Sequence, residues 1–182
     1  MIMSSYAERK QAILDIRAKF LECKKDAEEK YGVNMGLLTL RTTLRGTKMG
    51  SANMSFAGGP KLWINLNINA INGTKVQRDY VIDVTIPHEM AHIVNFLLPS
   101  SGKDHNRGWK SVCLALGGNG TVKYSGSEVG NISSSKNYNY LISGKNVSIG
   151  RIRHGRIQAG TTSYNFNDVE ILKSMWDGTR CK

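Results

Sequence analysis

The sequence predicts an α+β fold, in which helices and short strands follow one another in separate blocks. A long amphipathic segment opens the chain, three short strand-like segments follow, and a buried apolar helix comes next. A length of 182 residues suffices for one domain with its own core and a small appendage. We therefore expect a main domain over residues 1–118, a linker over 119–137 and a small β-rich subdomain over 138–182.

The first elements follow from the spacing of apolar residues. Residues 6–31 have apolar side chains at helical spacing and are followed by Gly32, which predicts one long helix. Residues 38–45, 52–56 and 61–68 have the composition of strands, and glycine-containing turns separate them. Because these turns are short, we expect a small antiparallel sheet in which successive strands are neighbours.

The most informative motif is His88-Glu89-Met90-Ala91-His92, which lies in an apolar segment. Residues four apart share one face of a helix, so the motif places two imidazoles one turn apart with a carboxylate beside them. Hydrolytic zinc sites have this layout: the histidines bind the metal and the glutamate takes a proton from metal-bound water. Pro87 either opens this helix or kinks a longer one that begins near Arg78, and we favour the longer helix.

A catalytic zinc site needs a third protein ligand. His105 lies 13 residues beyond His92 (105 minus 92), after a turn rich in proline, serine and glycine, and this gap suits a ligand that returns from a loop. Glu128 and Glu170 are the rivals, as in thermolysin-type sites. Glu128 lies in a Gly/Ser/Asn-rich stretch, which fixes a ligand poorly, so we favour His105.

Two other histidine signatures do not fit the sequence. Metzincins have glycine and histidine where this chain has Asn95 and Leu98, which excludes that subclass. An H-x₃-H-x₅-H zinc endoribonuclease would also need a histidine at position 98, which disfavours that class.

The chain is strongly basic, with a net charge of +11 and a pI near 9.7. No acidic residue occurs between positions 129 and 167, where Lys145, Arg151, Arg153 and Arg156 are interleaved with aromatic residues. Cations combined with aromatic faces suit the phosphates and unstacked bases of a nucleic acid. We therefore predict that these four residues contact DNA, with single strands favoured; the alternative is a solvated basic hairpin.

From residue 138 onward, the sequence predicts short strands followed by a helix. Residues 138–166 predict strands with turns at Ser143-Gly144 and His154-Gly155. Asn167, with Glu170 three residues later, predicts the capped start of a last short helix that runs through Trp176.

Cysteine content and hydropathy indicate the cellular compartment of the protein. Cys23, Cys113 and Cys181 are an odd number without a CxxC pair, which argues against a disulfide framework and a cysteine-rich zinc module. Neither a secretory signal nor a membrane span is visible. We therefore expect an intracellular protein, cytoplasmic or nucleoid-associated, without a membrane partner.

The order of these parts resembles the SprT-like family of zinc metallopeptidases, which includes Spartan. The matching stretches are Gly50-Ser51-Ala52, residues 62–67, residues 84–92 and residues 105–110, and the resemblance runs from the first helix to Leu116. It implies a zincin-like metalloprotease domain in which His88, His92 and His105 bind one Zn²⁺ per chain and Glu89 is the catalytic acid/base.

The resemblance also implies a class of substrate. Eukaryotic members look like DNA-activated proteases that act on DNA-bound proteins, which implies protein substrates of this kind here. Bacterial members usually add a zinc ribbon; residues 138–166 take its place without its cysteines, so no second zinc is expected. The alternative is a non-proteolytic zinc-containing DNA-binding or scaffold module, but the presence of Glu89 favours an enzyme.

Overall fold

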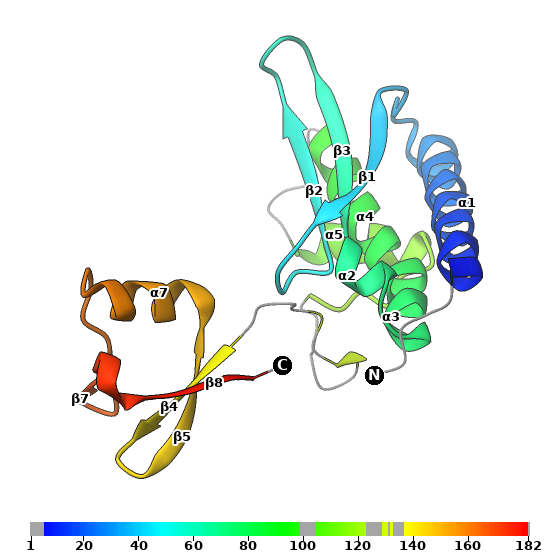
Figure 1. The fold of residues 1–182 in the computed structure, drawn as a ribbon. Helices are drawn as coiled ribbons and strands as arrows, with labels where there is room; N and C mark the ends of the chain where they lie inside the picture. The colour runs from blue at the N-terminus through cyan, green and yellow to red at the C-terminus, as the bar shows by residue number, and fades with distance from the viewer. Residues whose placement is uncertain (1–5, 99–104, 123–128, 131, 133–136, 182) are drawn as a thin grey trace. The chain divides into compact units, whose positions relative to one another are not determined.

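The computed structural model describes residues 6–98, 105–122, 129–130, 132 and 137–181 (Figure 1). The chain forms two compact units, residues 1–133 and residues 134–182. Both combine helices with a small sheet, which confirms the predicted α+β class. Among the described residues, no helix has the length and apolar character needed to cross a membrane.

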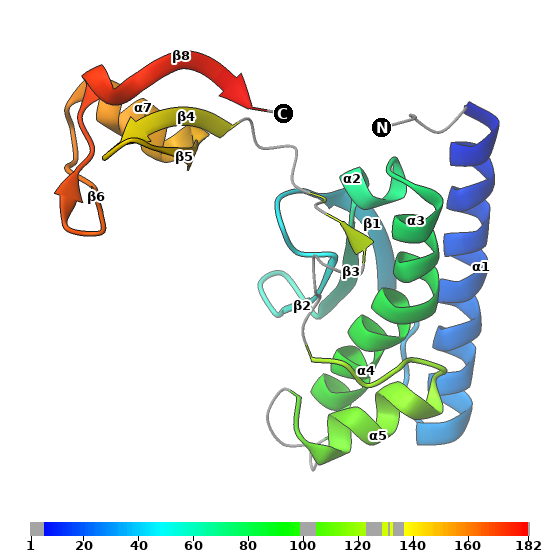
Figure 2. The same cartoon turned by 90° about the horizontal axis from the view of Figure 1, so that it is seen from below.

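The first unit is a sheet with helices packed on one face (Figures 1 and 2). Helix α1 (Tyr6–Tyr31) forms as predicted and ends at Gly32, whose positive φ of 64° suits a residue without a Cβ. Its buried side chains recur every three or four residues, namely Ala12, Ile16, Phe20, Cys23 and Ala27. They join a core made with the buried face of the sheet and with helix α4 (Ile86–Leu97).

The sheet is mixed, so the predicted antiparallel meander is wrong. Strands β1 (Leu38–Leu44), β2 (Gly50–Ser55) and β3 (Lys61–Asn67) have the spatial order β1-β3-β2. Strand β2 pairs with β3 antiparallel, whereas β1 pairs with β3 in parallel. The short connection after β1 therefore passes the end of β3 and places β2 at the far edge of the sheet.

Buried Asn67 holds that connection in place. Its Nδ2 donates to the carbonyls of Gly46 at 3.1 Å and Lys48 at 2.7 Å, and its backbone N–H donates to the carbonyl of Met49 at 2.9 Å. Its Oδ1 accepts from the N–H of Asn69 and caps the short helix α2 (Ile68–Ile71). One side chain thus fixes both the course of the β1–β2 connection and the end of β3.

The motif helix is part of a longer helical segment, as we predicted. Helix α3 (Lys75–Tyr80) begins at a capping box between Thr74 and Gln77, a few residues before the predicted start. A π-helical turn (Val81–Thr85) then leads into α4, and the N–H of Ile86 donates to the carbonyl of Val81. The π turn precedes Pro87, which has no N–H to donate in the first turn of α4.

The remaining residues of the first unit pack against its core. Helix α5 (Arg107–Ala115) packs on α4. Val129 and Ile132 belong to the segment that we expected to be a linker, yet both are buried in the core of the first unit. This burial explains why the first unit continues past residue 118 to residue 133.

The second unit contains a three-stranded antiparallel sheet in the order β5-β4-β8. Strands β4 (Asn137–Ile142) and β5 (Lys145–Gly150) form a hairpin whose turn is Ser143-Gly144, as predicted. Both turn residues have positive φ, 50° and 73°, which matches the twist of a two-residue hairpin. Strand β8 (Trp176–Cys181) pairs with the other edge of β4.

Two predictions for this unit are wrong. Residues 151–159 form helix α7 (Arg151–Ala159) instead of a strand pair that turns at His154-Gly155, because His154, Ile157 and Gln158 face inward at helical spacing. The predicted last helix is instead a hairpin of β6 (Asn165–Phe166) and β7 (Val169–Glu170), followed by a short 3₁₀ turn (Lys173–Met175). Asn167 and Asp168 both have positive φ, so this pair is a hairpin turn and not a helix cap.

Candidate metal centre

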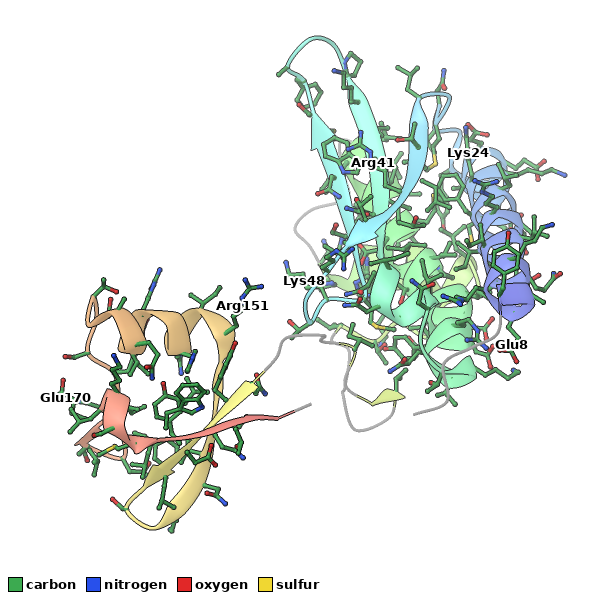
Figure 3. The ribbon with its side chains drawn as sticks, viewed as in Figure 1. Glu8, Lys24, Arg41, Lys48, Arg151 and Glu170 are labelled. Carbon is green, nitrogen blue, oxygen red and sulfur yellow. The ribbon has the colours of Figure 1, made fainter. Side chains whose placement is uncertain are left out.

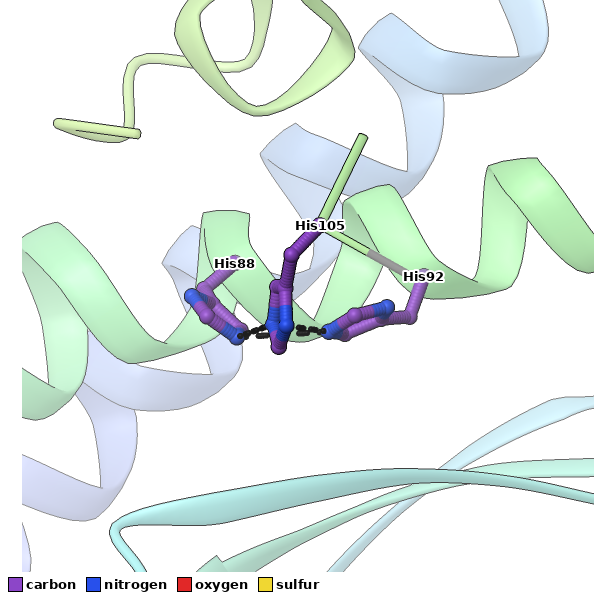
Figure 4. Close-up of side chains that lie close together, drawn as sticks. All are labelled: His88, His92 and His105. Carbon is purple, nitrogen blue, oxygen red and sulfur yellow. Dashed lines mark hydrogen bonds between the residues drawn. The ribbon is translucent and has the colours of Figure 1, made fainter. Parts of the chain in front are cut away.

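Three histidines converge in the first unit. His88 and His92 project from one face of α4, and His105 reaches them from the segment before α5 (Figure 4). Their Nε2 atoms are 3.3 Å apart for His88 and His92, 3.2 Å for His92 and His105, and 3.2 Å for His105 and His88. The structure therefore brings together the three residues that we predicted as ligands and presents one nitrogen from each.

These separations suit a small tetrahedral metal ion. Zn²⁺ binds imidazole nitrogens at about 2.0–2.1 Å, and two corners of such a tetrahedron are about 3.3–3.4 Å apart. Three like nitrogens at this spacing can hold one cation and leave a fourth position open. In the described part of the chain, these histidines are the one group of His, Cys, Asp or Glu residues with ligand atoms this close together.

His88 is fixed in the protonation state that a metal needs. Its Nδ1 lies 3.0 Å from the carbonyl oxygen of Thr121, and because a carbonyl can only accept, Nδ1 carries the proton and Nε2 keeps its lone pair. Burial, together with the charges of His92 and His105, lowers the pKa of His88 from 6.5 to about 4. The ring is therefore neutral at pH 7, ready to donate Nε2 to a cation.

His105 is positioned by the start of helix α5. The next residue, Asn106, caps this helix by accepting a hydrogen bond from the N–H of Trp109 at 2.8 Å. His105 has a φ of 59°, a left-handed conformation that costs a non-glycine residue about 1–2 kcal/mol. The capped helix start holds the backbone in this conformation, which directs the imidazole to the other two.

Trp109 forms the wall behind all three imidazoles. Its fully buried indole has ring centroids 4.6 Å from His88, 5.4 Å from His92 and 4.7 Å from His105. Its Nε1 donates to the carbonyl of His88 at 3.4 Å. The packing partners of Trp109 are thus the candidate ligands themselves.

Replacing Trp109 with Phe should therefore loosen the site without removing a ligand. The smaller ring gives up part of the contact and the bond to the His88 carbonyl, and loss of such supporting contacts typically weakens metal binding by about 10–100-fold. Competition with a zinc-binding dye would measure the affinity. Trp63→Phe, on the sheet, is the matched control and should keep the parent affinity; equal affinities for both variants and the parent would contradict the assigned role.

Glu89 lies beside the histidines and is buried, with 7% of its surface exposed. On the sheet, Gly50, the first residue of β2, lies close to it. A Cβ at Gly50 would lie 2.9 Å from Oε1 of Glu89 and 2.6 Å from Cγ2 of Thr85, both closer than a real Cβ approaches. The backbone of β2 therefore approaches the Glu89 carboxylate at a distance that only glycine permits.

A cavity of about 880 Å³ opens onto the three histidines and Glu89. One wall is α4 and the preceding π turn, and the opposite wall is the edge strand β2 with the connection that leads into it. Phe96 and Val122, both partly exposed, also line it and supply apolar surface. The volume falls in the usual range for a site that binds an extended organic ligand.

Glu170, one of the two rival ligands, is not part of this group of described residues. Glu128 lies outside the described residues, and Glu170 is in the second unit, where it accepts a hydrogen bond from the Ser163 hydroxyl at 2.6 Å. Burial raises the pKa of the Cys23 thiol to about 11 and also raises that of Cys113, so both thiols are protonated at neutral pH and poor metal ligands.

The predicted DNA-contacting residues all lie in the second unit. Lys145 begins β5, and Arg151, Arg153 and Arg156 lie on α7 and not on a hairpin; all four are exposed. Arg156 donates to the Tyr164 hydroxyl at 3.2 Å, and the Arg153 guanidinium lies 5.6 Å from the centre of the same ring.

Two parts of the centre were not predicted from the sequence. The carbonyl of Thr121 has no sequence signal, because any residue can present one. Gly50 does have a signal, since it opens one of the stretches on which the family resemblance rests, but its closeness to Glu89 depends on the sheet order.

Fold and site together are compatible with a metallopeptidase, in which a helical histidine pair and a third histidine hold the metal beside a glutamate. The model of the SprT-like family matches residues 18–129, more than half of the chain. Protein SprT of Shewanella oneidensis (strain MR-1) is 25% identical over 147 residues, which cover 79% of this chain and 86% of that protein. The chain belongs to the SprT-like family.

No solved structure gives a significant match. The zincin-like fold therefore stays a prediction, supported by the motif helix and the mixed sheet described above. Membership in the SprT-like family suggests a function of the metalloprotease type.

Proposed function

We propose that this protein is a zinc-dependent peptidase that acts on DNA-bound proteins. The observation that carries the proposal is the convergence of three Nε2 atoms, 3.2–3.3 Å apart, beside a buried glutamate on the wall of a large cavity. His88, His92 and His105 would hold the metal. A bound zinc ion lowers the pKa of a coordinated water and polarises a substrate carbonyl.

Glu89 is the residue that moves protons in this proposal. Its carboxylate accepts a proton from the attacking water and then delivers it to the nitrogen of the leaving amine. Gly50 lets the β2 backbone come close to this carboxylate, which limits the positions that its side chain can take. Trp109 and the Thr121 carbonyl keep the imidazoles oriented, so Glu89 acts beside metal ligands whose positions are fixed.

The edge strand β2 is the proposed docking line for the substrate backbone. The backbone N–H of Asn67 donates to the carbonyl of Met49, so these two residues form a hydrogen-bonded pair of the β2–β3 ladder. Such pairs alternate with non-bonded pairs along an antiparallel ladder, and Ala52 with Ile64 is a non-bonded pair. The N–H and C=O of Ala52 therefore point away from β3. Ala52 also lines the cavity. An extended polypeptide can therefore pair with β2 and present a carbonyl to the histidines.

Ala52→Pro tests this docking line. Proline removes the outward N–H and leaves the ladder to β3 intact, as edge strands tolerate. Loss of one such hydrogen bond should raise KM for a peptide substrate roughly 3–10-fold with little change in kcat. Ala52→Ser keeps the N–H and should behave as the parent; an equal rise in KM for both variants would attribute the effect to side-chain size.

The DNA part of the proposal rests on the second unit. Exposed Arg151, Arg153 and Arg156 on α7 present three cations from one short helix. Tyr164 orients two of these guanidinium groups. The helix therefore offers ordered phosphate contacts, with an aromatic ring next to them.

Replacing these three arginines by alanine should flatten the salt dependence of single-stranded DNA binding. Each neutralised phosphate adds about 0.7 to the slope of log K against log salt, so the slope should fall by about 2. Fluorescence anisotropy of a labelled oligonucleotide would measure it, and zinc content should not change. An unchanged slope in a folded variant would show that α7 is only a solvated surface.

The function is tested with the full-length zinc-loaded protein. A histone and an unfolded protein such as casein serve as substrates, each with and without single-stranded DNA and with a chelator. We expect cleavage that the chelator abolishes and that DNA stimulates for the DNA-binding substrate. Absence of cleavage under every condition, with zinc bound, would favour the non-proteolytic scaffold instead.

A further inference from the structure

The sheet of the first unit has a polar face that its helices do not cover. Along β3, Leu62, Ile64 and Leu66 are buried toward the helices, so Lys61, Trp63 and Asn65 project to the opposite face. The pairing places polar or basic residues beside them, namely Thr39 and Arg41 on β1 and Ser51, Asn53 and Ser55 on β2. We refer to these eight residues as the open sheet face.

This face is positively charged. The sequence from Lys30 to Arg78 contains no aspartate or glutamate. Arg41 and Lys61 on the open sheet face, and Arg45 and Lys48 in the β1–β2 connection, are all exposed, and none forms an ion pair with another described residue. Figure 3 shows Arg41 on the sheet and Lys48 in the connection. Polyanions are therefore the complementary partner.

One aromatic ring lies among these basic side chains. Trp63 is half-buried on the middle strand, and the Arg41 guanidinium lies 4.5 Å from the centre of its ring. A tryptophan ring and a guanidinium plane are the two surfaces on which unpaired bases stack in protein complexes with single strands. An acidic protein segment would use the cations but would have no base to place on the ring.

We propose that the open sheet face binds single-stranded nucleic acid, with a base against Trp63 and Arg41 and phosphates against Lys61, Arg45 and Lys48. The proposal deepens the DNA part of the proposed function and rests on it. Lys48 also lines the cavity at the histidines. A strand on this face therefore ends at the mouth of the candidate active site, where a protein bound to the strand meets Glu89.

The test measures anisotropy of a labelled oligothymidine with the full-length protein at several salt concentrations. Arg45→Gln/Lys61→Gln should weaken binding and lower the salt slope by about 1.4, because two phosphate contacts are lost. Lys10→Gln/Lys25→Gln on α1 removes the same charge and should keep the parent slope. Trp63→Leu should weaken binding at least about fivefold at every salt concentration, since it removes a stacking surface.

Each outcome decides between the proposals. If the parent does not bind the oligonucleotide, the DNA part of the proposed function and this inference both fail. If the parent binds but Arg45→Gln/Lys61→Gln behaves as the α1 control does, only this inference fails, even if Trp63→Leu does not fold. If polyglutamate binds as tightly as DNA and the Trp63→Leu variant binds DNA normally, the face accepts acidic proteins instead, which also overturns the inference.

Discussion

Glu89→Gln is expected to lower peptide cleavage by about 10²–10⁴-fold, the usual contribution of a general acid/base. Glutamine has nearly the same shape but cannot accept a proton, and His88, His92 and His105 are unchanged. Zinc content and the thermal unfolding temperature should therefore stay close to those of the parent. The measurement is the initial rate on casein, with zinc content determined on the same sample.

A matched control is Glu29→Gln, which removes an exposed carboxylate from α1 and should leave the rate unchanged. If the Glu89→Gln variant kept the full rate with bound zinc, the proton would have to go to another group, and the proposed role of Glu89 would be wrong. A variant that lost zinc instead would point to a structural role for the carboxylate.

His105→Ala should release the metal. Two imidazoles remain on α4, and loss of a direct ligand should weaken binding by more than the roughly 100-fold expected for a supporting contact. His105→Gly makes the same deletion but relieves the left-handed backbone at this position, so its metal-free form should be at least as stable as the parent's. Zinc content after dialysis and thermal unfolding of the metal-free proteins would measure both effects.

Glu128→Gln and Glu170→Gln are the comparison variants for this prediction. Both should retain zinc, because neither glutamate is proposed as a ligand. If Glu128→Gln lost zinc while His105→Ala retained it, the centre would belong to the glutamate-ligated class. If all three variants retained zinc, the convergence of the three imidazoles would be incidental to metal binding.

The site could be predicted from the sequence because its main features depend on local spacing. His88 and His92 are four residues apart on a helix, and this spacing alone places them on one face. His105 was found by its distance along the chain and by elimination of glutamates. The wall formed by Trp109 and the approach of Gly50 to Glu89 depend on contacts between distant segments, and no local pattern predicts them.

The errors in the fold prediction have physical causes of the same kind. The short β1–β2 connection favoured neighbouring strands, but buried Asn67 binds two carbonyls of that connection and directs β2 to the far edge. In the second unit, Asn167 and Asp168 suit both a helix start and a hairpin turn. The structure adopts the turn, in which Phe166 pairs with Val169.

The π turn before α4 lies between the anchored helix α3 and the metal ligands. Its hydrogen bond joins residues five apart instead of four, so the wide turn takes up one extra residue and α4 continues with its side-chain directions nearly unchanged. Helix α3 is anchored on one side of this turn, where Gln77 donates to the Val129 carbonyl and Arg78 to the Gly73 carbonyl. Deleting one residue from positions 81–85 would let the turn close as a regular α-helical turn, so the anchors and the histidine face should both be retained. The π turn thus absorbs one residue of chain length between anchor and ligands, whereas a deletion between His88 and His92 would rotate the two histidines apart by about 100°.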